Sequence, residues 1–305
     1  MTAPPHDAPG RYVEVRDTRL RVDERGPADA PPLLYIHGGP GQGCFDFMAW
    51  QGDRLAKDLR VIGVDQRGAL FSGPLPNDEA ITEDGLVDDF EALREALGIE
   101  RWTILGHSFG ARPALRYATR HPSAVSSAIF DCPPWDHSYG LPAMLELTVP
   151  MLEELGQTEA ADRARAMIAA RPTPNADVWR QRFEIVNALG DRRNALYLKE
   201  PGRYGDPPYP SESLPDEMQA RSARHSQTVT ASDGFAESLL PLLAEVRQPA
   251  LLIRGSTDPA ASWPEVDRFR ADVPHGRVEI FEDSGHFPQL EEPERYAEVV
   301  RDFVR

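Results

Sequence analysis

Cysteine and long apolar runs are both scarce in this sequence. Only 2 of the 305 residues are cysteine, Cys44 and Cys132, and that is too few for a disulfide framework. No stretch approaches the roughly 18 consecutive apolar residues that identify a membrane-spanning helix. Residues 1–10 are proline-rich and polar, without the basic and apolar regions of a secretory signal, and indicate a frayed tail. We therefore expect a cytoplasmic protein with no membrane segment.

Basic residues are outnumbered by acidic ones. Lysine and arginine total 33 against 49 aspartate and glutamate residues, which gives a formal net charge of -16. A surface of this average charge repels nucleic-acid phosphates and anionic lipid headgroups, so neither is an expected partner. The sequence has no paired-cysteine motif, no His-Glu-x-x-His and no Gly-x-Gly-x-x-Gly in a suitable context, so we expect no metal or cofactor. The expected partner is a small-molecule or short-peptide substrate.

Short apolar runs alternate with helical patterns along most of the chain. This alternation predicts an α/β fold in which helices cover a mostly parallel sheet. Strand signals are missing between residues 134 and 244, and this change indicates an inserted helical cap. The expected core therefore comprises residues 1–133 and 245–305. Strands are expected at residues 12–15 and 19–23, as a hairpin, and at residues 33–36, 61–64, 102–105, 127–130, 250–253 and 278–281.

The segment Gly106-His107-Ser108-Phe109-Gly110 lies between an expected strand and an expected helix. A Gly-x-Ser-x-Gly sequence in this setting is typical of a sharp turn that lifts the serine hydroxyl above the edge of a sheet. Glycine on both sides permits the sharp turn, and the N-terminus of the next helix faces developing negative charge. The pattern therefore predicts that Ser108 is a nucleophile.

A serine hydroxyl is a weak nucleophile and needs a base, together with a group that orients the base. Among the eight histidines, His286 follows the last expected strand and precedes the last expected helix, so it can reach the edge where Ser108 lies. Asp258 follows the preceding strand, and the order serine, aspartate, histidine is the one expected on this fold. We predict His286 as the base and Asp258 as its orienting acid. Asp131, also at a strand end, is the alternative acid.

Two loops offer backbone N–H donors for a developing oxyanion. Gly39 lies in the turn His37-Gly38-Gly39-Pro40, and Phe109 directly follows Ser108. Glycines let the backbone approach a substrate closely, and proline stiffens the turn. An oxyanion hole requires donors that are held in place before the charge develops. We predict that Gly39 and Phe109 supply them.

Together these motifs resemble the α/β-hydrolases and, within them, the proline iminopeptidases. The turn at residues 37–41, the segment Asp65-Gln66-Arg67-Gly68, the Ser108 turn and the Asp258 and His286 loops match that branch in order over nearly the whole chain. The resemblance implies an α/β-hydrolase fold with a cap, a Ser-His-Asp triad, and release of an N-terminal proline or small apolar residue from peptides. The serine turn departs from the branch, which usually has glycine and tryptophan where this chain has His107 and Phe109.

The resemblance extends into the cap. The segment from Trp179 to Glu184 resembles a family segment whose glutamate holds the substrate's free amine, which makes Glu184 a candidate amine anchor. In a second family segment, residues 220–225, Ala223 stands where the family has a glutamate. Aromatic residues are also candidates to line an apolar pocket under the cap, namely Phe45, Phe47, Trp135, Trp179, Tyr204 and Tyr209.

The leading hypothesis is a serine hydrolase that works through an acyl-enzyme and resembles the proline iminopeptidases. Because Ala223 removes one carboxylate, the first alternative is an esterase, lactonase or amidase that acts on a small metabolite. The second alternative is a non-hydrolytic cyclase, acyltransferase or ligand-binding protein that uses the same pocket.

Overall fold

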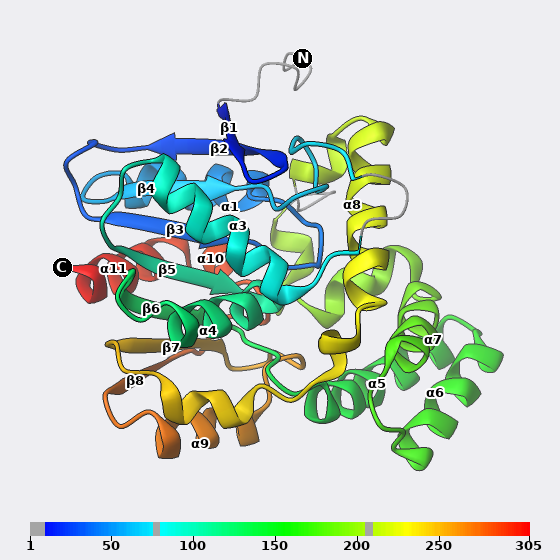
Figure 1. The fold of residues 1–305 in the computed structure, drawn as a ribbon. Helices are drawn as coiled ribbons and strands as arrows, with labels where there is room; N and C mark the ends of the chain where they lie inside the picture. The colour runs from blue at the N-terminus through cyan, green and yellow to red at the C-terminus, as the bar shows by residue number, and fades with distance from the viewer. Residues whose placement is uncertain (1–9, 76–79, 205–209) are drawn as a thin grey trace.

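The computed structural model describes residues 10–75, 80–204 and 210–305. These residues form one sheet with the strand order β1-β2-β4-β3-β5-β6-β7-β8 (Figure 1). The β1–β2 hairpin and the β2–β4 pair are antiparallel, and the other neighbouring pairs are parallel. The predicted hairpin and mostly parallel sheet are confirmed. The strands are β1 (Arg11–Val15), β2 (Thr18–Arg25), β3 (Pro32–Ile36), β4 (Arg60–Val64), β5 (Trp102–His107), β6 (Val125–Asp131), β7 (Ala250–Gly255) and β8 (Gly276–Phe281).

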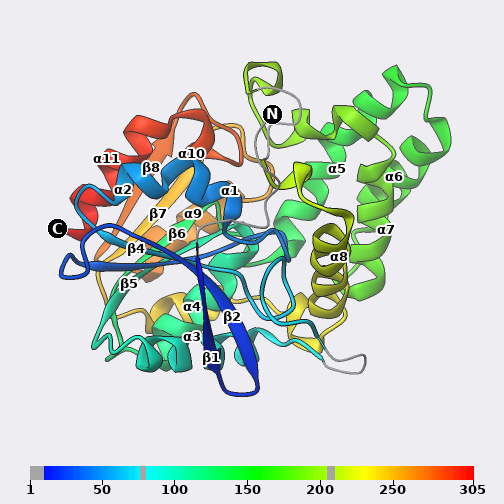
Figure 2. The same ribbon diagram turned by 90° about the horizontal axis from the view of Figure 1, so that it is seen from above.

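Both faces of the sheet are covered by helices. Side chains alternate along β3, so Leu34 and Ile36 join the core on one face while Leu33 and Tyr35 join the core on the other. The first face packs on α3 (Glu83–Ala96), α4 (Ala111–Arg120) and α9 (Trp263–Asp272). The second packs on α1 (Phe45–Phe47), α2 (Asp53–Leu55) and α11 (Pro293–Val304), which lie with α10 (Pro288–Glu291) opposite α3 and α4 in Figure 2.

The ends of α3 follow the local signals in the sequence. Thr82 begins the helix, because its hydroxyl accepts a hydrogen bond from the Gly85 backbone N–H at 3.0 Å. Gly98 follows the end of the helix with a φ of +64°, a left-handed conformation that glycine adopts without strain. These caps fix where α3 begins and ends, and its apolar side chains pack against the sheet.

Between β6 and β7 the chain leaves the sheet and forms α5 (His137–Glu154), α6 (Thr158–Ala170), α7 (Ala176–Asn187) and α8 (Asp216–Thr230). Figure 1 shows these helices beyond the carboxyl ends of the parallel strands. Leu141, Met144 and Ile185 belong to a small hydrophobic core that this segment forms apart from the sheet. The segment is helical, as the expected cap requires, and the boundaries at residues 134 and 244 stay a prediction.

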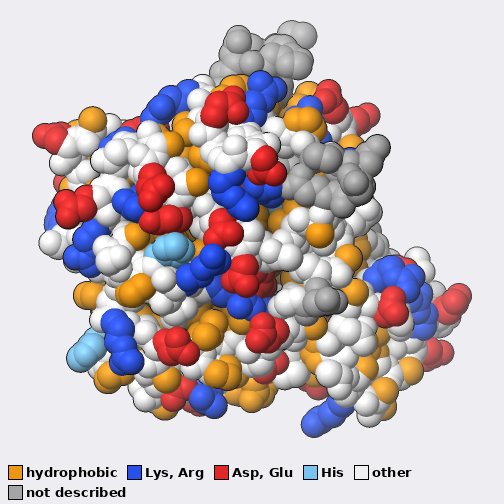
Figure 3. Space-filling model, viewed as in Figure 1, with side chains coloured by type: hydrophobic (Ala, Val, Ile, Leu, Met, Phe, Trp, Pro, Cys, Tyr) orange, Lys and Arg blue, Asp and Glu red, His pale blue; other side chains and the backbone are white. Residues whose placement is uncertain are grey.

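Charged side chains of both signs are interleaved over the face of the molecule that Figure 3 shows. Within the described parts of the chain, no helix combines the length and the apolar character needed to cross a membrane. Of the expected N-terminal tail, residues 1–9 lie outside the described residues, and so does Tyr209.

Candidate active site

The turn between β5 and α4 carries Ser108 at the carboxyl edge of the sheet. Ser108 has a φ of +52°, in the left-handed region that residues with a side chain rarely occupy. A Cβ on Gly106 would lie 2.4 Å from the Gly110 carbonyl oxygen, and a Cβ on Gly110 would lie 2.2 Å from that of Ile36. The turn therefore requires both glycines sterically, and the partly exposed Ser108 side chain stands between them.

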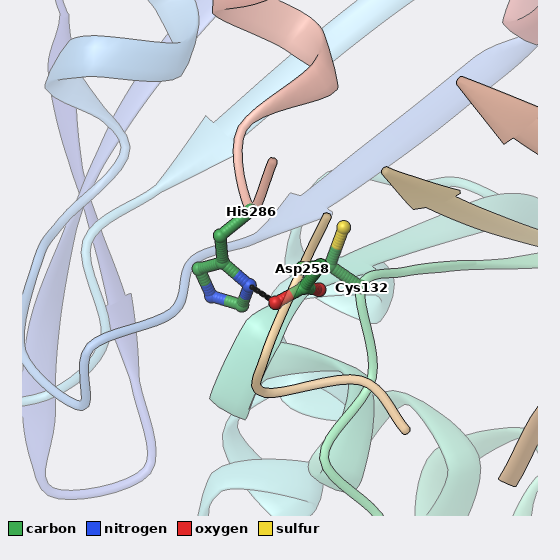
Figure 4. Close-up of side chains that lie close together, drawn as sticks. All are labelled: Cys132, Asp258 and His286. Carbon is green, nitrogen blue, oxygen red and sulfur yellow. Dashed lines mark hydrogen bonds and ion pairs between the residues drawn. The ribbon is translucent and has the colours of Figure 1, made fainter. Parts of the chain in front are cut away.

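The Ser108 hydroxyl begins a chain of hydrogen-bonded side chains. Ser108 Oγ lies 2.8 Å from His286 Nε2, and His286 Nδ1 lies 2.9 Å from Asp258 Oδ1. Figure 4 shows the imidazole and the carboxylate facing each other. Burial acts to raise the pKa of Asp258, but interaction with His286, helped by the Ala260 backbone N–H and the charge of Arg254, outweighs it, so this pKa is lowered. An ionised Asp258 holds a proton on Nδ1 and leaves Nε2 able to accept one from Ser108.

Two residues that the sequence analysis did not identify hold these loops. Arg254 donates hydrogen bonds to the carbonyl oxygens of Asp258 at 2.9 Å and Ala261 at 2.6 Å. The backbone N–H of His286 donates to the carbonyl oxygen of Tyr197 at 2.7 Å, which ties the histidine loop to the helical segment. For the first contact the sequence offers a usable signal, an arginine that directly follows the apolar run at residues 250–253. The second has none, because any residue at position 197 offers the same backbone oxygen.

Cys132, Asp258 and His286 are a candidate set of metal ligands. One donor atom of each lies within 4.8 Å of the others, and Figure 4 shows the three side chains together. However, Asp258 and His286 already hydrogen-bond to each other, and burial raises the pKa of the Cys132 thiol well above its usual range. A cysteine must lose its proton to bind a metal. The electrostatics of this cluster therefore do not favour a metal site.

Asp131, the alternative acid, is not the hydrogen-bond partner of His286. Its Oδ2 accepts a hydrogen bond from the hydroxyl of Tyr296 at 2.8 Å. Burial is the largest influence on this carboxyl group and raises its pKa to about 7, although the Tyr296 hydrogen bond acts in the opposite direction. The geometry therefore places Asp258, rather than Asp131, beside the histidine.

Replacing Asp131 with asparagine is expected to make stability less dependent on pH. Because the folded-state pKa of about 7 exceeds the usual 3.8, the folded protein binds this proton more tightly than the unfolded chain does. The stabilising contribution is complete below about pH 4 and is lost as the pH rises through about 7. The loss is at most about 4 kcal/mol. Urea unfolding at about pH 5 and about pH 8 measures the part of this loss that falls above pH 5, at most about 3 kcal/mol, and an equal loss in wild type and Asp131→Asn would contradict this account.

The turn at residues 37–41 and the segment at residues 65–68 support each other. His37 Nε2 accepts a hydrogen bond from the Gln66 backbone N–H at 3.0 Å, and the Gln66 side chain donates to the His37 carbonyl oxygen at 2.9 Å. Burial, together with nearby His225, lowers the pKa of His37 to about 3, so the ring is neutral and can accept this bond. The observed contacts of these two motif residues are structural, and they shape the loop that carries Gly39.

A cavity of about 410 Å³ opens above Ser108. Ser108, His286, Gly39 and Phe109 line it, so the residues predicted to supply oxyanion donors share the cavity with the serine. Gly39 has a φ of +108°, and a Cβ on it would lie 2.8 Å from the Gln42 nitrogen, so this turn also requires glycine. The oxyanion role of Gly39 and Phe109 stays a prediction.

Glu184 does not line the cavity, and its interpretation as an amine anchor is wrong. Its carboxylate pairs with Arg163 at 2.8 Å, and its side chain is 49% exposed. Helix periodicity explains the error. Trp179, Arg182 and Phe183 are spaced three and four residues apart on α7 and line the cavity together, whereas Glu184 lies on another face of the helix. Of the predicted cap residues, Trp179 is thus placed at the cavity.

The other described aromatic candidates do not line the cavity. Trp135 is fully buried and stacks on Phe269 in the main core, and Phe47 stacks on Tyr35 with ring centroids 3.7 Å apart. Large aromatic rings near strand ends bury most of their apolar surface when they pack in the core. Sequence alone does not distinguish such core rings from rings that line a pocket. Phe45 packs toward Phe71, and Tyr204 packs in a cluster beside Phe287. The predicted pocket role is therefore wrong for four residues: Phe45, Phe47, Trp135 and Tyr204.

The cavity also contains residues that the sequence analysis missed. Arg182 had a usable signal, because its spacing from Trp179 predicts a shared helix face. Arg193 had none, since it lies in η4 (Gly190–Leu196), a short 3₁₀ helix that no sequence pattern predicted. Asp46 is buried, and its two oxygens accept hydrogen bonds from Ser211 at 2.7 and 2.6 Å. The missed polar lining residues are Gln42, Asp46, His137, Arg182, Arg193, Asn194, Tyr197, Ser211, Gln219, Ser222 and Ser226.

Comparison with known proteins agrees with this architecture. A curated proline iminopeptidase from Heyndrickxia coagulans is 29% identical over 308 aligned residues, which cover 96% of this chain and 97% of the relative. The solved structure of a proline iminopeptidase-related protein from Thermus thermophilus matches with a TM-score of 0.72 and 26% identity, over 97% of this chain and 96% of that one. A proline iminopeptidase from Mycobacterium smegmatis matches with a TM-score of 0.64 and 25% identity, over 97% of both chains.

The similarity to proline iminopeptidases that the motifs indicated is therefore confirmed. Residues 31–293 match the family model described as the alpha/beta hydrolase fold, and the sheet order and parallel pairing agree with it. This chain belongs to the alpha/beta hydrolase fold family.

Proposed function

We propose that this protein is a serine hydrolase that cleaves an ester or amide bond of a small molecule through an acyl-enzyme on Ser108. The observation that carries the proposal is the chain of hydrogen bonds from Ser108 Oγ through His286 to buried Asp258. Ser108 and His286 also line a cavity large enough for a small substrate. A hydroxyl, a base in contact with it and a buried acid behind the base are what activation of a serine requires.

The proposed reaction has two halves. Ser108 Oγ attacks the substrate carbonyl carbon while His286 Nε2 accepts the hydroxyl proton, and Asp258 stabilises the imidazolium that forms. The N–H groups of Gly39 and Phe109 stabilise the oxyanion. His286 then donates its proton to the leaving group as the bond to the carbonyl carbon breaks. A water molecule, deprotonated by His286, attacks the acyl-enzyme, releases the acid and restores the Ser108 hydroxyl.

The cavity lining favours a small ester or amide over a substrate held by its free amine. An ammonium group is held by carboxylates that face it, and Ala223 lines the cavity at the position where the family resemblance led us to expect a glutamate. Glu184 is paired elsewhere with Arg163. The cavity instead contains Arg182 and Arg193, which repel an ammonium group.

Release of an N-terminal proline is the second candidate function. It is favoured by the similar proteins named proline iminopeptidases and by the carboxyl group of Asp46 on the cavity wall. Burial raises the pKa of Asp46 above its usual value, although hydrogen bonds from Ser211 and Gln42 act in the opposite direction. Both oxygens of Asp46 already accept hydrogen bonds from Ser211, so the carboxyl group has less capacity to hold an ammonium group, and for this reason we rank this function second.

Hydrolysis rates on three substrates separate the two candidates. They are 4-nitrophenyl butyrate, proline 4-nitroanilide and N-acetylproline 4-nitroanilide, each tested with wild type and Ser108→Ala. We expect ester hydrolysis that is lost in Ser108→Ala and little cleavage of either anilide. Cleavage of the free-amine anilide alone, with a KM raised in Asp46→Asn, would establish the second candidate instead. Hydrolysis of all three at equal rates by wild type and Ser108→Ala would contradict both.

A further inference from the structure

Two arginines line the cavity above Ser108, and neither forms an ion pair with an acidic residue of the described chain. We propose that Arg182 and Arg193 bind a carboxylate group of the substrate. This inference rests on the proposed hydrolase function, because it names the class of molecule whose ester or amide bond Ser108 would cleave. That class is a small molecule with a free, ionised carboxyl group in addition to the bond that is cleaved.

Arg182 is a buried cation that has no acidic partner among the residues the structure describes. Arg182 is only 7% exposed, and its Nε has no hydrogen-bond partner in the described structure. Its guanidinium group lies 4.5 Å from the centre of the Trp179 ring and contacts the sulfur of Met144. Neither contact neutralises a positive charge. Removing a guanidinium group from water is costly unless an anion compensates it, so an anionic ligand fits this position.

Arg193 brings a second positive charge to the same end of the cavity. Its Nε is also buried without a hydrogen-bond partner among the described residues, and its guanidinium lies 5.5 Å from the Phe183 ring centre and 5.8 Å from that of Tyr197. Burial alone would raise the pKa of the Tyr197 hydroxyl, but the charges of Arg182 and Arg193, together with hydrogen bonding to both, outweigh it and lower this pKa. Both guanidinium groups therefore act on one hydroxyl in the cavity wall.

Neighbouring arginines on the same segments are paired. Arg180, on α7, contacts Asp177 at 2.9 Å, and Arg192, which precedes Arg193 in η4, contacts Glu154 at 2.7 Å. The chain has 49 acidic residues against 33 basic ones, so acidic partners are plentiful. Within the described part of the chain, the lack of an acidic partner is thus particular to the cavity-facing arginines of these segments. This contrast argues against an ordinary surface role for Arg182 and Arg193.

Tyr197 connects the positively charged end of the cavity to Ser108. Its ring centre lies 5.6 Å from that of His286, and its hydroxyl is influenced by both arginines. A carboxylate bound by the two arginines would therefore be separated from His286 by about the length of the Tyr197 side chain. The planar fork of guanidinium N–H donors matches the two oxygens of a carboxylate. The cavity of about 410 Å³ therefore suits a small acid whose carboxylate is a few bonds from the cleaved carbonyl.

The test compares substrates that differ only in this charge. The first pair places the carboxylate on the acyl side: 4-nitrophenyl hydrogen adipate and the 4-nitrophenyl ester of adipamic acid. The second pair places it on the leaving group: butyryloxyacetate and butyryloxyacetamide. Wild type is expected to hydrolyse the acid of at least one pair on the order of 10- to 100-fold more efficiently than the matching amide, by kcat/KM.

Four variants show whether the arginines cause this preference. Arg182→Gln and Arg193→Gln should each reduce the ratio of acid to amide toward one. Arg180→Gln and Arg192→Gln, on the same segments, remove equally charged side chains that do not line the cavity, and should retain the wild-type ratio. If Arg182→Gln does not fold, as judged by thermal unfolding, Arg193→Gln carries the test.

Direct binding separates failure of this inference from failure of the proposed function. Calorimetry with Ser108→Ala should detect binding of adipate but no binding of adipamide. Adding Arg182→Gln to Ser108→Ala should abolish adipate binding. If that double variant does not fold, Arg193→Gln replaces Arg182→Gln in it. One outcome is hydrolysis that depends on Ser108 but does not favour the acid over the amide in either pair, together with no adipate binding. This result would overturn the carboxylate site and would still support the proposed hydrolase function. Adipate binding that needs the arginines, without hydrolysis of any substrate, would support the carboxylate site and overturn the hydrolase.

Discussion

Replacing Ser108 with alanine is expected to lower kcat/KM for the best ester substrate by on the order of 10⁴-fold or more. The substitution removes the oxygen that would form the acyl-enzyme, and His286 Nε2 then has no hydroxyl at 2.8 Å to deprotonate. The residual rate should come only from substrate binding and from the backbone donors around the carbonyl. Steady-state hydrolysis of 4-nitrophenyl esters measures the effect.

The fold should survive this substitution, because alanine removes one partly exposed oxygen from a turn that Gly106 and Gly110 allow to close. Ser256→Ala is a matched control. Ser256 also lies after the end of a strand of the sheet, where its hydroxyl donates to the carbonyl oxygen of Glu282 at 2.8 Å, and it should retain full activity. A rate for Ser108→Ala within about tenfold of wild type would contradict the assignment of the nucleophile.

Replacing Asp258 with asparagine is expected to lower kcat by on the order of 10⁴-fold. The ionised carboxylate accepts a hydrogen bond from His286 Nδ1–H at 2.9 Å, which keeps the proton on Nδ1 and leaves Nε2 free to accept one. An asparagine amide in the same place can donate to Nδ1 instead, which puts the proton on Nε2 and prevents it from accepting a proton from Ser108. The effect should appear in kcat more than in KM, because Asp258 is buried and does not line the cavity.

Asp131→Asn is the matched control for this prediction. Both carboxylates are buried at strand ends, but Asp131 accepts its hydrogen bond from Tyr296 rather than from His286. Its substitution should therefore change activity by less than about tenfold. The opposite result, a large loss for Asp131→Asn and a small one for Asp258→Asn, would make Asp131 the orienting acid.

The strands and the reacting side chains were predictable from sequence because each depends on local pattern and chain order. Buried strands appear as short apolar runs, and parallel strands bring their carboxyl ends to one edge of the sheet. Residues that follow those ends, such as Ser108, Asp258 and His286, therefore meet although 178 residues separate the serine from the histidine. The helix cap at Thr82 likewise needs only neighbouring residues.

The walls of the cavity were not predictable in the same way. The direction in which an exposed helix residue points depends on how the helix packs, and the family resemblance drew attention to Glu184 instead of its neighbour Arg182. Aromatic residues such as Trp135 pack equally well in a core or a pocket. Arg193 lies in the short 3₁₀ helix η4 and Tyr197 directly follows it, and no sequence pattern predicted either, so only the three-dimensional structure shows that they line the cavity with Ser108.

The most direct test of the central claim is the mass of the protein during turnover. Wild type quenched in acid soon after mixing with 4-nitrophenyl butyrate is expected to carry one butyryl group, and peptide mapping should place it on Ser108. Ser108→Ala should carry none at that position. A burst of 4-nitrophenol from wild type that leaves no butyryl group on Ser108, or an adduct on another residue, would contradict an acyl-enzyme on Ser108.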